Sequence, residues 1–148
     1  MDQPVTVNPY ATGIDASGFE MDQLWPEVDP QFKPFGARLL IQIRRVVSTT
    51  KSGIVLVTES KDTEAWNMQV GKIISMGPLA FKNRKNAEDW PEGMWAKVGD
   101  FVRFPRWGGD RITVNMKEGD PVVILILNDH DLLGAYQGDP RKVHTFIE

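Results

Sequence analysis

The residues of this sequence whose types and spacing could support chemistry are few. His130 lies between Asp129 and Asp131, and the second histidine, His144, stands alone in a polar tail. A histidine between two carboxylates could bind a metal ion or transfer protons. In an extended strand, however, residues 129 and 131 share one face and residue 130 points to the other, which is a poor arrangement for three ligands. We interpret Asn128–Asp131 as a turn that begins the next strand, because Asn and Asp favour turns.

Other common sources of catalysis are missing from the sequence. There is no cysteine, which excludes disulfides, thiolate zinc ligands and cysteine nucleophiles and fits an intracellular location. There is also no glycine-rich dinucleotide fingerprint, no P-loop, no zinc-protease pattern and no nucleophile elbow. We therefore predict no catalytic residue, no metal site and no cofactor, and expect that the chain is not an enzyme.

A second candidate chemistry is nucleic-acid binding. Arg103, Arg106 and Arg111 surround Trp107, and arginine together with an aromatic ring can stack on bases in the groove of a β-barrel. The net charge of −3 argues against this interpretation, because nucleic-acid-binding domains usually carry a basic excess. A nucleic-acid-binding β-barrel module remains the alternative function, and the other interpretation is that these residues form solvated loop and strand faces.

The most unusual feature is a short apolar run inside a polar segment. Ile54-Val55-Leu56-Val57 lies within residues 48–66, a stretch rich in Ser, Thr, Lys, Asp and Glu. If the flanks form a loop, the apolar run is exposed, and exposed apolar clusters often mark an interaction site. Taken alone, the run is better explained as a further core strand over Gly53–Thr58, and only the order and context of other sequence blocks favour an exposed segment.

The elements that position these residues are predicted to be β-strands. Short apolar and β-branched segments alternate with Gly, Pro, Asn and Asp, a pattern typical of an all-β barrel or sandwich. No segment with a helical period is long enough to indicate a helical domain. The expected strands are Ala37–Arg45, Val70–Met76, Phe101–Phe104, Arg111–Val114, Pro121–Leu127 and Leu132–Tyr136.

The two ends of the chain differ in composition from the middle. Residues 1–32 carry six acids and four prolines and no Lys or Arg, whereas all 17 basic residues lie from Lys33 onward. We interpret residues 1–32 as a loosely structured extension that the barrel does not need, although its Tyr10, Phe19, Leu24 and Trp25 could dock on the barrel. Residues 137–148 are polar and are interpreted as a second loose tail.

Several blocks, taken in order, resemble the GroES-type co-chaperonins, the chaperonin-10 family. Any one block is weak, but together they span Lys33–Tyr136 with compatible spacing. They are Lys33-Pro-Phe-Gly-Ala-Arg-Leu-Leu-Ile41, Ser52-Gly-Ile-Val-Leu56, Gly71-Lys-Ile-Ile-Ser-Met-Gly77, Lys97-Val-Gly-Asp-Phe-Val-Arg-Phe104 and Val123-Ile-Leu-Ile-Leu-Asn-Asp-His-Asp-Leu-Leu133.

The resemblance implies an irregular GroES-like β-barrel over residues 33–136, with a mobile loop at about 48–63 and a roof-like insertion at about 79–97. It implies a homoheptamer that caps a GroEL-type chaperonin ring and encloses unfolded client protein, with no nucleic-acid or membrane partner. Gly53, Ile54, Val55 and Leu56 would bind the chaperonin, which would itself bind and hydrolyse ATP. In this family the first strand of one subunit pairs with the last strand of its neighbour, so Leu39–Ile43 and Val122–Leu127 are expected at subunit contacts.

The chain also departs from the usual pattern of the family. The roof region lacks the usual Asn-Gly turn and contains Trp90-Pro-Glu-Gly-Met-Trp95 instead. The extension 1–32 and the tail 137–148 exceed the usual domain. Such additions resemble co-chaperonins of tailed bacteriophages, which would imply a capsid-protein client and a location in the host cytoplasm. Medium-chain dehydrogenases contain a similar domain, but this chain lacks their zinc-binding cysteines and a nucleotide-binding domain.

Overall fold

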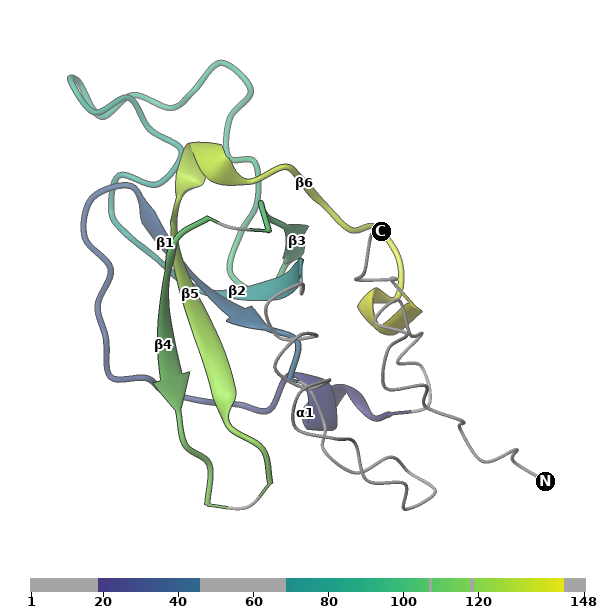
Figure 1. The fold of residues 1–148 in the computed structure, drawn as a ribbon. Coiled ribbons are helices and arrows are strands. Elements are labelled where there is room, and N and C mark those ends of the chain that lie inside the picture. The colour runs from purple at the N-terminus through teal and green to yellow at the C-terminus, as the bar shows by residue number, and fades with distance from the viewer. Residues whose placement is uncertain (1–18, 46–68, 107, 118, 143–148) are drawn as a thin grey trace.

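A computed structural model describes residues 19–45, 69–106, 108–117 and 119–142. Within these ranges, six strands form one antiparallel sheet in the order β4-β5-β1-β2-β3-β6 (Figure 1). The helical elements are α1 (Met21–Leu24), η1 (Asp129–Asp131) and η2 (Pro140–Lys142), each a single short turn. The strands are β1 (Arg38–Ile43), β2 (Val70–Met76), β3 (Phe101–Arg103), β4 (Asp110–Val114), β5 (Val122–Asn128) and β6 (Gly134–Ala135). The predicted all-β fold is confirmed.

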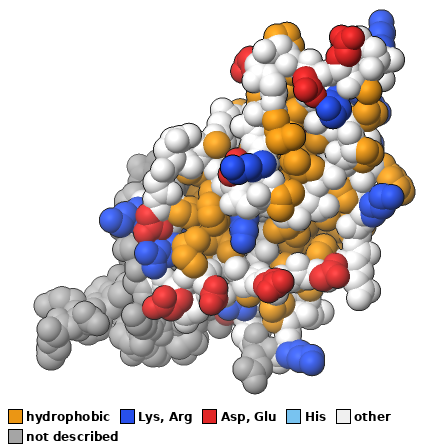
Figure 2. Space-filling model, turned by 180° about the vertical axis from the view of Figure 1, so that it is seen from behind, with side chains coloured by type: hydrophobic (Ala, Val, Ile, Leu, Met, Phe, Trp, Pro, Cys, Tyr) orange, Lys and Arg blue, Asp and Glu red, His pale blue; other side chains and the backbone are white. Residues whose placement is uncertain are grey.

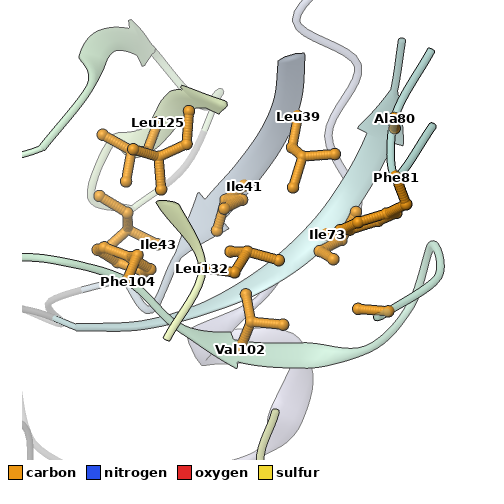
Figure 3. Close-up of a cluster of buried hydrophobic side chains, with 12 residues drawn as sticks. Leu39, Ile41, Ile43, Ile73, Ala80, Phe81, Val102, Phe104, Leu125 and Leu132 are labelled. Atoms are coloured by element: carbon orange, nitrogen blue, oxygen red, sulfur yellow. The ribbon is translucent and has the colours of Figure 1, made fainter. Parts of the chain in front are cut away.

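The sheet curls around one main cluster of buried side chains (Figure 3). Val102 of β3 and Leu125 of β5 belong to this cluster although two other strands separate β3 from β5 in the sheet. A flat sheet could not bring the side chains of non-neighbouring strands together in this way, so the sheet is curved into an irregular barrel. Strand β1 lies near its centre, and every β1 residue from Leu39 to Ile43 is buried.

The central position of β1 corrects the expectation that Leu39–Ile43 and Val122–Leu127 pair between subunits. In the structure β1 pairs with β5 of the same chain, with Leu40 opposite Ile126. Each of these strands also has a second neighbour, β2 for β1 and β4 for β5. A strand with apolar residues on both faces suits the middle of a sheet. Within the described ranges the two edges of the sheet are β4 and β6.

Phe19–Phe32, part of the extension predicted to be loosely structured, docks on the barrel, which is the alternative that the sequence left open for Leu24 and Trp25. This part contains α1, and Leu24 and Trp25 are buried at 2% and 5% exposure. Further along, Val28 packs against the cluster of Leu40, Val122 and Ile124, which lies on the other face of the sheet from the main core. The segment shows no regular hydrophobic period because a single helical turn is followed by irregular chain. Residues 1–18 lie outside the described ranges.

Candidate functional site

The predicted chaperonin-binding residues, Gly53, Ile54, Val55 and Leu56, lie outside the described residues, as does the whole of residues 46–68. The structure describes the two ends from which this segment departs. Strands β1 and β2 are antiparallel neighbours, with Ile43 opposite Gly71. Connections between such strands commonly need only about 2–5 residues, and much longer ones are usually functional. The length of residues 46–68 therefore supports a role beyond joining two strands.

The two ends of this segment are fixed to one another and to the barrel. The backbone N–H of Arg44 donates to the carbonyl oxygen of Val70 at 3.0 Å. The Gln69 side-chain amide donates to the carbonyl oxygen of Phe104 at 3.0 Å, and its oxygen accepts from the Arg103 guanidinium at 3.1 Å. We define the loop root as Arg44, Arg45, Gln69 and Val70.

A glycine next to the loop root allows the strands to pack closely. A Cβ atom on Gly71 would collide with the Ile41 side chain and would lie 3.0 Å from the Phe104 ring. Ile41 and Phe104 are fully buried members of the main core. Any side chain at position 71 would therefore disturb the core beneath the loop root.

Two of the arginines considered for nucleic-acid binding, Arg103 and Arg111, are engaged or partly buried within the protein. Arg103 is engaged with Gln69 and lies 3.5 Å from the Tyr136 hydroxyl, so its guanidinium is used within the protein. Arg111 is half-buried, and this burial lowers the pKa of its guanidinium. Trp107 lies outside the described residues. The described geometry thus gives the alternative function no support.

The histidine flanked by two acids serves as a structural turn. Asp129 is buried, and its carboxylate accepts the backbone N–H groups of Phe81 at 2.8 Å and of His130 at 2.7 Å. The His130 side chain is 67% exposed. No cluster of three or more metal-ligating side chains occurs in the described part of the chain. Sequence analysis gave the turn but missed Asp129 as the tie to Phe81, because the two residues are far apart in the chain.

Residues 79–97 project from one end of the sheet, as the teal-to-green loop at the top of Figure 1 shows. A single β-bridge joins Lys82 to Asp89, and the Lys82 ammonium lies 2.6 Å from the Asp89 carboxylate. Beneath this turn, Phe81, Trp90 and Trp95 pack ring against ring, with centroids 4.8–6.2 Å apart. This aromatic cluster therefore supports the projecting region, which lacks the Asn-Gly turn that is usual in the family.

Comparison with known proteins agrees with this geometry. The family described as "Chaperonin 10 Kd subunit" matches residues 31–136, which include every strand of the sheet. The chain belongs to this family. Among chaperonin-10 relatives, the chain is 32% identical over 107 residues to "Co-chaperonin GroES" of Clostridium acetobutylicum. It is 31% identical over 104 residues to that of Maricaulis maris and 33% identical over 106 residues to that of Clostridium botulinum.

The coverage of these chaperonin-10 matches distinguishes the part of the chain that is shared with the relatives from the parts that are additional to it. The matches cover 70–72% of this chain and 96–98% of the relatives. The family match begins at residue 31, so α1 and the buried Leu24 and Trp25 precede it. Among the described residues, no helix has the length and apolar character needed to cross a membrane.

Proposed function

We propose that this chain acts as a co-chaperonin by capping a GroEL-type chaperonin ring through residues 53–56. The observation that carries the proposal is the long connection between β1 and β2 in a chaperonin-10 chain. Its two ends are fixed, and between them lies the apolar run Ile54-Val55-Leu56. Such a run, on a segment far longer than a hairpin requires, suits insertion into an apolar groove of a partner.

The energetics of this contact favour weak individual loops that act together. Burial of three aliphatic side chains supplies about 1.5–3 kcal/mol each. Ordering the surrounding backbone costs about 1–2 kcal/mol per residue and removes much of that gain. Several loops displayed by one ring bind far more tightly than one loop because later contacts form within a single complex. Weak individual contacts still allow the cap to be released.

We further propose that the ring is a homoheptamer whose subunits meet at the edges of the sheet. The outer edge of β6 is unpaired among the described strands, and a groove beside it is lined by Met94, Trp95, Leu133 and others. Leu133 is 61% exposed and Phe35 is 68% exposed in the single chain. Figure 2 shows hydrophobic side chains gathered over the middle of the face opposite to that of Figure 1. A second copy would cover such surfaces, and a closed ring leaves no edge exposed.

The partners follow from this role. The chaperonin ring would bind and hydrolyse ATP, and the enclosed client would be an unfolded protein in the cytoplasm. Origin in a tailed bacteriophage and a capsid-protein client remain predictions.

Co-elution with a purified GroEL-type ring tests the proposal directly. We expect the chain to co-elute with the ring in the presence of ATP and to support refolding of a client that requires a cap. Leu56→Ala should abolish both effects. Absence of wild-type binding across a panel of bacterial chaperonins would contradict the proposed function.

A further inference from the structure

The segment Phe19–Pro26, which precedes the family match, packs directly against the loop root. Its backbone carbonyl at Leu24 accepts the N–H of Arg45 at 2.8 Å. The Arg45 guanidinium donates to the carbonyl oxygen of Gln23 at 2.8 Å and to that of Asp120 at 3.2 Å. Arg45 is the last residue described before the segment 46–68. The first end of that segment is therefore held by Gln23 and Leu24, outside the shared domain, together with Asp120 inside it.

The same segment also holds the second end of the loop root. Leu24 and Trp25 form a cluster with Val70, which is fully buried, and Phe101 packs against it. The Trp25 and Phe101 ring centroids are 4.7 Å apart in an edge-to-face arrangement. Val70 is both the first residue of β2 and the acceptor for Arg44. One short segment thus contacts the chain at both ends of residues 46–68.

Two further hydrogen bonds fix the segment to β1. The Trp25 indole N–H donates to the carbonyl oxygen of Gln42 at 3.1 Å. The Gln42 side chain in turn donates to the carbonyl oxygen of Pro26 at 2.7 Å. Gln42 is 2% exposed, so this reciprocal pair is shielded from water. Buried polar pairs of this kind define one geometry because any displacement leaves both groups unsatisfied.

The C-terminal tail also contacts the segment. The Arg141 guanidinium donates to the carbonyl oxygen of Phe19 at 3.0 Å and pairs with Asp139 at 2.8 Å. Tyr136 packs on the cluster of Leu24, Trp25 and Val70. In Figure 1 the described start of the chain, in purple, and its described end, in yellow, lie on the same side of the sheet. The two additions to the family domain therefore form one structure.

We infer that Phe19–Pro26, clamped by Arg141, is a positioning element that fixes the loop root and thereby sets the strength of chaperonin binding. The inference rests on the proposed function. A loop whose ends are fixed explores fewer directions, so less orientational freedom is lost when it binds. Because several subunits bind together, a small effect in each loop multiplies across the ring. Arg45 and Trp25 are positioning residues and need not touch the chaperonin.

Two variants, each with a matched control, test the inference. Arg45→Met removes the guanidinium donors to Gln23 and Asp120 but keeps an apolar stem. Its control, Arg84→Met, changes an exposed arginine of the roof. Deletion of residues 1–28 removes the positioning element, and deletion of residues 1–18 is its control. If the longer deletion does not fold, Arg45→Met decides.

The readouts separate positioning from general stability. Each variant is assayed for ring mass, for hydrogen exchange in peptides over 40–45 and 69–76, and for affinity to a GroEL-type ring with ATP, well below its melting temperature. We expect Arg45→Met and the 1–28 deletion to exchange faster at the root and to bind at least tenfold more weakly, with unchanged ring mass. Both controls should behave as wild type.

The contrary outcomes are distinguishable. If Arg45→Met binds the chaperonin with wild-type affinity while Leu56→Ala does not bind, the inference is overturned and the proposed function stands. Unchanged exchange at the root would also overturn it. Failure of the wild-type ring to bind would remove the proposed function, and the inference with it.

Discussion

The carboxylate of Asp129 accepts the backbone N–H of Phe81 at 2.8 Å across 48 residues of chain. Both residues are buried, at 2% and 1% exposure. Asp129 begins η1, which directly follows β5, and Phe81 begins the projecting turn that contains Lys82 and Asp89. This single bond therefore fixes the projecting region to the end of the most apolar strand.

Replacement of Asp129 should destabilise the fold and loosen the projecting region. Asp129→Ala leaves the buried N–H of Phe81 without its acceptor, at a cost of about 1–3 kcal/mol. Asp131→Ala, whose side chain is 37% exposed, is the matched control and should cost less than about 0.5 kcal/mol. Urea unfolding gives both values. Equal unfolding midpoints for the two variants would show that the tie to Phe81 contributes nothing.

A charge at the free edge of the sheet should break the ring without unfolding the subunit. Leu133 is 61% exposed in the single chain, so Leu133→Asp should change the stability of a subunit by less than about 0.5 kcal/mol. In the ring the same carboxylate would be buried without a partner, which is strongly unfavourable. We expect wild-type protein at about seven chain masses and the variant as monomer in analytical ultracentrifugation. Lys117→Glu, in the exposed turn before β5, should leave the ring intact.

The clamp between the two chain ends should weaken at acid pH. Side-chain hydrogen bonds from Arg141, together with its backbone N–H, lower the pKa of Asp139. Because this pKa is lower in the folded protein than in the unfolded chain, the stabilisation is fully present above the ordinary aspartate pKa of about 3.9 and is lost as pH falls through the lower folded value. The difference in urea midpoint between wild type and Asp139→Asn should therefore shrink as pH falls from about 7 to about 3. A constant difference would mean that the ion pair does not stabilise the clamp.

The sequence predicted the strands well because their apolar residues and the turns between them are local signals. The prediction Val70–Met76 matches β2 residue for residue, and the prediction Pro121–Leu127 differs from β5 by one residue at each end. The contact of Leu24 and Trp25 with Val70 could not be predicted in the same way. This contact joins residues that lie far apart in the chain. The acidic residues around Leu24 and Trp25 face solvent, so the local composition resembles that of a solvated tail.

Local sequence patterns also could not predict which strands are neighbours in the sheet. An apolar segment such as Leu39–Ile43 is compatible with pairing inside the chain or between subunits, and only the register of Leu40 opposite Ile126 decides. For the candidate site, the sequence supplied Gly53–Leu56 as a prediction, and the structure adds the root that holds the segment. The fixed ends at Arg45 and Val70 depend on long-range hydrogen bonds, for which the sequence contains no periodic signal.

Two leucine-to-alanine variants should have opposite effects, and the comparison addresses the predicted binding residues directly. Leu40 is 1% exposed and lies in the cluster with Val122 and Ile124. Leu40→Ala should therefore lower the free energy of unfolding by about 2–5 kcal/mol, because it removes buried methyl groups and leaves a cavity. If Leu56 is a binding residue, Leu56→Ala should change the melting temperature little.

Chaperonin binding should show the reverse order. At a temperature where both variants are folded, Leu40→Ala should cap a GroEL-type ring nearly as well as wild type. Leu56→Ala should lose most of its affinity, since every subunit of the ring loses the same contact at once and the losses multiply. Thermal unfolding and binding measured on the same samples provide the test. A large fall in the melting temperature of Leu56→Ala with unchanged binding would show that Gly53–Thr58 is a core strand, and the chaperonin contact would then have to lie on another part of the chain.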